Sequence, residues 1–372
     1  MKYLMVINTN YQLIVAVQIR RTFLKDDQVD IIITDHSQGN EQLAQRLKKA
    51  AVFGRVLSIY NRKMIYEATT KEKIKDFFEL GFSSENRFYP KQIEETPNYD
   101  GLFFYNLDLL VISLFDVLVK SNSRLTLNLF EEGFLSYGTE KVSNGRFSRK
   151  ESIFKLRKLG IKKDWTKYLK KYYCFFPGLI QREMPYQLVQ IPPIFSSDKE
   201  LVKLINSIFD FIPTENKYAA KYIYFEGWFE CDEERLVEKI AEIVGKENLL
   251  VKPHPRHQSD RYEKVGIKTS SDGNVPWEVV QLNFDFSDKV LMAVSSSCPI
   301  VASALLRQNI PALYLYPCVQ IHGTKTDQQT FEKVTQNIKN AIEQFQNQQG
   351  LLTKVKIARG QDQIAIVLKS LI

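Results

Sequence analysis

The sequence predicts an α/β protein built from two doubly wound, Rossmann-like halves. Short apolar runs rich in β-branched residues alternate with amphipathic stretches up to residue 130 and again from residue 221. Between them, the segment 185–200 carries Pro185, Pro192 and Pro193, which break helices and suit an interdomain connection. Strands that alternate with helices pair in parallel, so we expect a helix-covered parallel sheet in each half.

The pattern predicts the elements in order along the chain. In the first half, strands are expected at 2–8, 29–35, 55–60, 101–106 and 124–130, with helices at 11–23, 41–51, 71–80 and 107–120. In the second half, strands are expected at 221–227, 248–251, 289–294 and 311–317, with helices at 232–245, from 298, and at about 328–348. The length of 372 residues fits two domains. We expect them at 1–190, including a basic helical segment at 141–185, and at 191–372.

Composition excludes several classes of protein. With 44% hydrophobic residues the chain can bury two cores, and the apolar run after Lys2 is too short for a signal peptide or a membrane span. The four cysteines form no CxxC pair, and three of the four histidines are scattered without a carboxylate at ligand spacing. We therefore expect a cytoplasmic protein without structural disulfides or a metal site, and we leave open a homodimer.

A basic block stands out in the charge pattern. Between Lys141 and Lys171, twelve Lys and Arg residues face only Glu151 and Asp164, so this block holds more than the whole net charge of +8. Aromatic residues interrupt it, namely Phe147, Phe154, Trp165, Tyr168, Tyr172 and Tyr173. Segment 141–172 can meet an anionic membrane surface or an acidic glycan, or it can be a solvated pair of basic helices. No recognised nucleic-acid motif accompanies it, so nucleic acid is not an expected partner.

Three polar motifs each follow a predicted strand. Glu131-Glu132-Gly133 ends the strand at 124–130, and a carboxylate whose pKa is raised by its neighbour is a usable general base, although Glu-Glu-Gly is also a frequent turn. His254 lies between two prolines in Lys252-Pro253-His254-Pro255-Arg256, where it can hydrogen-bond a leaving phosphate beside positive charge, or be a rigid loop residue.

The third motif is Ser295-Ser296-Ser297, directly before a predicted helix. Ser297 is expected to cap that helix, which leaves spare hydroxyls and N–H groups for a phosphate. Between the last two motifs, Glu278 is an isolated carboxylate within Trp277-Glu278-Val279 that can accept hydrogen bonds from ribose hydroxyls.

In this order and spacing, the segments resemble the bacterial sialyltransferases of GT-B fold, the group that caps lipooligosaccharide and capsule. The resemblance rests on Glu131-Glu132-Gly133, His254-Pro255, Trp277-Glu278-Val279 and Ser296-Ser297, with Thr9 and Gln12 resembling a T-x-x-Q start. It implies two Rossmann-like domains facing a central cleft, an N-terminal acceptor domain and a C-terminal donor domain for a CMP-sugar. It further implies Glu132 as general base, His254 as acid or phosphate donor, Glu278 on the ribose, and Ser296 and Ser297 on the phosphate.

Several alternatives stay open. Some of the lipooligosaccharide group place the base before the His-Pro strand, where this chain offers Glu226, Glu230 and Asp232, although Asp232 also suits the N-cap of the helix at 232–245. The expected reaction is inverting transfer of sialic acid from CMP-sialic acid without a metal, since the chain holds no Asp-x-Asp. The rival functions are a GT-B transferase for another nucleotide-activated donor and a non-enzymatic binder of anionic polymers. As a transferase it would work at the inner face of the plasma membrane.

Overall fold

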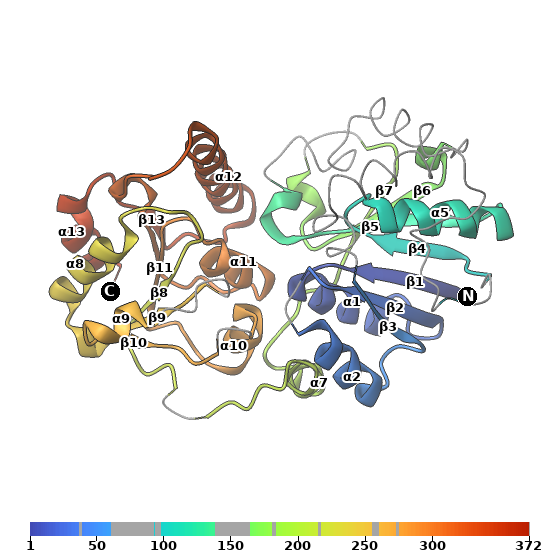
Figure 1. Cartoon of the computed structure of the whole chain (residues 1–372), viewed down its shortest axis with the longest axis horizontal. Coiled ribbons are helices and arrows are strands. Elements are labelled where there is room, and N and C mark those ends of the chain that lie inside the picture. Colours follow the sequence, from blue (N-terminus) through green and yellow to red (C-terminus); the bar gives the residue numbers. More distant parts are fainter. Residues whose placement is uncertain are drawn as a thin grey trace, which may run out of the picture. The chain divides into compact units, whose positions relative to one another are not determined.

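The computed structural model describes residues 1–36, 39–60, 93, 98–137, 164–180, 184–214, 217–254, 260–272 and 275–371. They divide into two units, Met1–Pro192 and Pro193–Ile372. Each unit contains a parallel sheet with helices in the connections between strands (Figure 1). The predicted α/β class with parallel sheets is confirmed. The predicted helix at 71–80 lies outside the described residues.

Unit 1, Met1–Pro192, is organised around a sheet with the strand order β3-β2-β1-β4-β5-β6-β7. The chain adds strands on one side up to β3 and restarts at β4 on the other, so the switch point lies between β1 and β4. Its strands and α-helices within the described residues are β1 (Lys2–Ile7), α1 (Asn10–Thr22), β2 (Gln28–Thr34), α2 (Asn40–Ala50), β3 (Val56–Ile59), β4 (Gly101–Phe104), α5 (Leu109–Ser121), β5 (Thr126–Phe130), β6 (Leu169–Cys174) and β7 (Gln187–Gln190).

Unit 2, Pro193–Ile372, has the strand order β10-β9-β8-β11-β12-β13. Its switch point lies between β8 and β11, which pair in parallel from Val290 opposite Tyr222 to Ala293 opposite Phe225. Its strands and α-helices within the described residues are α7 (Lys199–Phe209), β8 (Tyr222–Phe225), α8 (Glu233–Val244), β9 (Leu249–Lys252), α9 (Arg261–Lys264), β10 (Lys268–Thr269), α10 (Trp277–Asn283), β11 (Val290–Ala293), α11 (Cys298–Leu305), β12 (Ala312–Tyr314), α12 (Lys325–Gln349), β13 (Val355–Ile357) and α13 (Ile364–Lys369).

Local sequence explains where these elements begin and end. Thr9 starts α1 because its hydroxyl accepts the N–H of Gln12, and Thr324 and Asp327 form a reciprocal capping box at the start of α12. Gly350 ends α12 with a φ of 61°, a backbone conformation that suits glycine. The strands near the centre of each sheet are buried on both faces, as in β11, because helices cover both sides.

The structure corrects the expected helical segment at 141–185. Within its described part, Leu169–Cys174 is strand β6, which pairs in parallel with β5 and β7. The exposed Lys170 and Lys171 obscured the strand pattern, because burial resumes only with the Tyr-Tyr-Cys that follows. The expected connection after 185 also contains a strand, β7, which lies at the sheet edge between the prolines that flank it.

The aromatic residues at the end of the basic block belong to the core of unit 1. Trp165, Tyr172 and Tyr173 are buried, and the ring of Tyr168 packs against Phe115. They are therefore not a surface for lipid, whereas Lys170 and Lys171 keep exposed side chains. Phe147 and Phe154 lie outside the described residues. Among the helices that the structure describes, none has the length and apolar character needed to span a bilayer.

Candidate functional site

In unit 1, the carboxyl end of β5 carries two glutamates in different environments. Glu131 is 1% exposed, and its carboxylate accepts hydrogen bonds from the hydroxyl of Tyr11 at 2.5 Å, from the Phe175 N–H at 2.7 Å and from the Tyr137 hydroxyl. Burial raises the pKa of Glu131 to about 7, and the three donors oppose this shift. The raised pKa predicted for this motif thus belongs to Glu131, and burial is its first cause rather than the neighbouring carboxylate.

Glu132 is half-buried and is oriented by the start of α1. The side-chain amide of Gln12 donates to its Oε2 at 2.8 Å, and the N–H of Glu132 donates to the Ser136 hydroxyl at 2.7 Å. Gln12 is itself fully buried, and its Oε1 accepts the N–H of Asn8 at 2.7 Å. The T-x-x-Q start therefore has a structural meaning: Thr9 caps the helix whose Gln12 holds Glu132.

In unit 2, the switch point brings Gly227 and Ser295 together. Gly227 follows β8 by two residues, and a Cβ at this position would lie 2.8 Å from the Ser295 hydroxyl oxygen. Ser295 is 7% exposed, and its hydroxyl has no hydrogen-bond partner among the residues that the structure describes. A buried hydroxyl without a partner is costly, so this oxygen is suited to a ligand that supplies one.

The other two serines lead into α11. Ser297 occupies the N-cap position, but its exposed side chain makes no capping hydrogen bond, which corrects the expectation for this residue. The Ser296 hydroxyl accepts the Cys298 N–H at 3.4 Å, and its carbonyl accepts the Tyr314 hydroxyl at 2.9 Å. The start of an eight-residue helix thus presents the Ser297 hydroxyl at its positive end, a setting that favours an anion.

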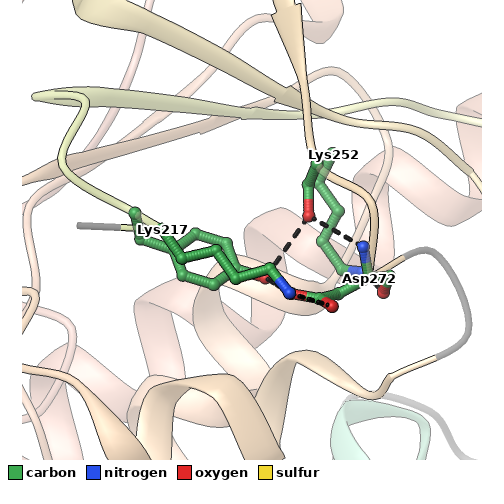
Figure 2. A network of polar contacts seen from close by, with 5 residues as sticks. Lys217, Lys252 and Asp272 are labelled. Atoms are coloured by element: carbon green, nitrogen blue, oxygen red, sulfur yellow. Dashed lines mark hydrogen bonds and ion pairs between the residues drawn. The ribbon is translucent and has the colours of Figure 1, made fainter. Parts of the chain in front are cut away.

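Lys252, at the end of β9, is buried in a polar network (Figure 2). Its ammonium donates to the Asp272 carbonyl at 2.8 Å, while the Asp272 carboxylate accepts from Lys217 at 2.6 Å and from the Tyr218 hydroxyl at 2.8 Å. Burial lowers the pKa of Lys252, against the attraction of Cys298, Asp272 and Glu278. The charge of Lys252 therefore lies close to Asp272, in the segment before α10, and to Cys298 at the start of α11.

Glu278 lies in the first turn of α10 and is 7% exposed. Burial raises its pKa, while its own backbone N–H and the charge of Lys252 lower it. The structure thus brings Glu278, Lys252 and the start of α11 into one electrostatic neighbourhood, although they come from different connections of the sheet.

His254 follows β9 by two residues and is held through its backbone. Its N–H donates to the Glu226 Oε2 at 2.8 Å, and the N–H of Glu226 donates to the Lys252 carbonyl at 3.1 Å. His254 is half-buried, whereas Pro255, Arg256 and His257 lie outside the described residues.

The alternative acidic residues have other partners. Asp232 precedes α8 but makes no side-chain cap, because its Oδ1 accepts the Gln320 N–H at 2.8 Å; the expected N-cap role of its side chain is wrong. Glu233, which the sequence did not single out, is buried and accepts the Gly227 N–H at 2.9 Å and the Tyr224 hydroxyl at 2.7 Å. Burial raises the pKa of Glu233 to about 7.

No group of three or more His, Cys, Asp or Glu side chains suited to a metal ion is found within the described part of the chain. The carboxyl edge of unit 2 offers an anion the Ser295 and Ser297 hydroxyls and the start of α11, beside the buried carboxylates of Glu226, Glu233 and Glu278.

Two solved structures share the architecture of this chain. The chain is similar to an alpha/beta-galactoside alpha-2,3-sialyltransferase from the luminous marine bacterium Photobacterium phosphoreum, with a TM-score of 0.54, 12% identity, and 96% of this chain and 97% of that chain covered. It is also similar to Arabidopsis thaliana UGT89C1 complexed with UDP, with a TM-score of 0.51, 9% identity, and coverage of 99% and 89%. At such identities the likeness concerns the fold, which is that of the GT-B glycosyltransferases.

The family follows from the sequence match. The model of the alpha-2,8-polysialyltransferase family (POLYST) matches residues 3–315, and the chain belongs to this family. The resemblance to bacterial GT-B sialyltransferases is thereby confirmed, and the non-enzymatic alternative is overturned. No curated protein sequence matches the chain significantly.

The burial of Glu131 predicts a specific dependence of stability on pH. Its pKa is about 7 in the folded state against an ordinary value of 4.5, so its contribution to stability is full below pH 4.5 and is lost as the pH rises through 7. Between these values, wild type should lose up to about 3 kcal/mol of unfolding free energy relative to Glu131→Gln. Denaturant unfolding of both proteins across this range measures the difference. Parallel curves for the two proteins would contradict the burial argument.

Proposed function

We propose that the protein transfers sialic acid from CMP-sialic acid to a hydroxyl of the terminal sugar of a cell-surface glycan, with inversion and without a metal. Capsule or lipooligosaccharide is the proposed acceptor glycan. The observation that carries this proposal is the anion-suited edge of unit 2, where the unpartnered Ser295 hydroxyl and the Ser297 hydroxyl adjoin the start of α11. The family name supports a terminal sialic acid as the acceptor sugar.

The donor contacts are assigned to unit 2. Ser295, Ser296, Ser297 and His254 would hydrogen-bond the single phosphate. Glu278 would accept hydrogen bonds from the ribose hydroxyls. Lys252 contributes indirectly, because its ammonium already binds the Asp272 carbonyl and supports the segment that leads to α10. A monophosphate carries less charge than a diphosphate, so hydroxyls, N–H groups and one histidine can stabilise it as it leaves.

The base is assigned to Glu132 in unit 1. Its carboxylate would take the proton of the acceptor hydroxyl as that oxygen bonds to the anomeric carbon. The bond between this carbon and the phosphate oxygen breaks at the same time, and CMP keeps the electron pair. Glu132 suits this role better than Glu131, whose carboxylate is 1% exposed and accepts three hydrogen bonds.

The proposed place of action is the inner face of the plasma membrane. The exposed Lys170 and Lys171 of β6 support this location by charge, since anionic headgroups attract basic surface residues.

Binding of CMP tests the donor assignment. CMP at 100 times its Kd should stabilise the fold by about 2.7 kcal/mol, and UDP, GDP and CDP at the same concentration should stabilise it less. Ser297→Ala should weaken CMP binding about tenfold, because a hydrogen bond to a charged phosphate is lost. Ser287→Ala is the matched control, since exposed Ser287 precedes β11 at the opposite edge of the sheet. Calorimetry measures the stabilisation by each nucleotide and the affinity of each variant for CMP. Stronger binding of UDP than of CMP would refute the proposed CMP-sugar donor.

Kinetics of Glu132→Gln test the base. With CMP-sialic acid and a sialylated oligosaccharide, kcat should fall about 10²- to 10⁴-fold while CMP binding is retained. Gln12→Ala should give a smaller loss, because it releases the amide that holds Glu132. The matched control is Glu41→Gln in α2, and NMR of the wild-type product should show the inverted anomer. A Glu132→Gln enzyme with normal kcat would move the base elsewhere.

Metal removal tests the remaining part of the mechanism. Transfer should continue at its full rate after dialysis against EDTA, because the proposed phosphate contacts are all protein groups. Initial rates before and after dialysis, with and without added magnesium or manganese, measure this. Activity that disappears in EDTA and returns with either ion would disprove the metal-independent mechanism.

A further inference from the structure

Glu226 connects the two sides of the segment that carries His254. It follows β8 directly, and its side chain is only 1% exposed. One carboxylate oxygen, Oε2, accepts the His254 N–H at 2.8 Å, and the other, Oε1, pairs with the Arg261 guanidinium. Since His254 comes just after β9 and Arg261 begins α9, one buried carboxylate holds the chain on both sides of residues 255–259.

The backbone around Glu226 is held as firmly as its side chain. Its N–H bonds to the Lys252 carbonyl at 3.1 Å, which extends the β8–β9 pairing by one residue. The next residue, Gly227, donates its N–H to the buried Glu233, and a Cβ there would lie 2.8 Å from the Ser295 hydroxyl oxygen. Glu226, whose carboxylate holds His254, is therefore fixed in position relative to Ser295 on the other side of the switch point.

These contacts argue against Glu226 as the base. A base must reach the acceptor hydroxyl with a carboxylate oxygen, but both oxygens of Glu226 are engaged inside unit 2. The ion pair between Glu226 and Arg261 already balances both charges. It therefore does not explain why the other carboxylate oxygen accepts the His254 N–H. The geometry therefore connects Glu226 to the position of the histidine.

We propose that Glu226 is a positioning residue, which sets the place of His254 by binding its backbone N–H while Arg261 holds the carboxylate. This inference rests on the proposed phosphate contact of His254. A displacement of about 1 Å at a reacting group can cost about 100-fold in rate, so the loss of this contact is expected to act mainly on kcat.

The experiment compares Glu226→Gln, Arg261→Lys and the matched control Glu263→Gln, which removes an exposed carboxylate from the same helix α9. In the full-length protein with labelled histidine, Glu226→Gln should shift the imidazole NMR signals of His254 and leave those of His36 and His322 in place. Arg261→Lys should shift them in the same way by a smaller amount, and Glu263→Gln should not. Arg261→Lys also covers the case in which Glu226→Gln does not fold.

Kinetics complete the test. Glu226→Gln should lower kcat about 10- to 100-fold in the wild-type background and by less than about twofold in a His254→Ala background, because it acts through the histidine. Equal losses in both backgrounds, or unshifted His254 signals in the folded variants, would overturn the positioning role. If the signals shift but the wild type neither binds CMP nor transfers sialic acid, the positioning stands and the proposed function fails instead.

Discussion

The parallel pairing of β8 with both β9 and β11 is the constraint on which the candidate donor site depends. Parallel strands end at the same sheet edge, so this pairing places Glu226 and Gly227 between the His254 side and the Ser295 side. A Cβ at Gly227 would lie 2.8 Å from the Ser295 hydroxyl oxygen, so a larger residue there would displace this hydroxyl. Beyond the strand ends, the N–H groups of Gly227 and His254 donate to the carboxylates of Glu233 and Glu226 instead of to a strand.

Buried carboxylates recur at these edges and are accommodated in two ways. Glu131 and Glu233 accept their hydrogen bonds from hydroxyl and N–H groups, and burial raises the pKa of each to about 7. Glu226 instead keeps a guanidinium beside it. All three accept a backbone N–H, from Phe175, Gly227 and His254 respectively, so each orders a chain segment near the site. Stability and site geometry thus depend on the same groups.

The sequence predicted that the polar motifs follow the ends of strands, but not which groups each side chain hydrogen-bonds. Glu131-Glu132 and the three serines follow β5 and β11 as expected. The choice between the two glutamates depends on Tyr11, Gln12, Tyr137 and Phe175, which are distant in sequence or outside the motif. Strand β6 was not predicted, because its exposed Lys170 and Lys171 give it the same basic composition as the block that precedes it.

By itself, the sequence determined the α/β class, the alternation of elements and the order of the polar motifs, because periodicity and strand-end position are local properties. It also determined the family, through the match over residues 3–315. Only the tertiary structure decided which carboxylates are buried, which hydroxyl lacks a partner and which residue holds His254. Burial and hydrogen bonding are set by atoms brought together from distant parts of the chain, and no local pattern encodes them.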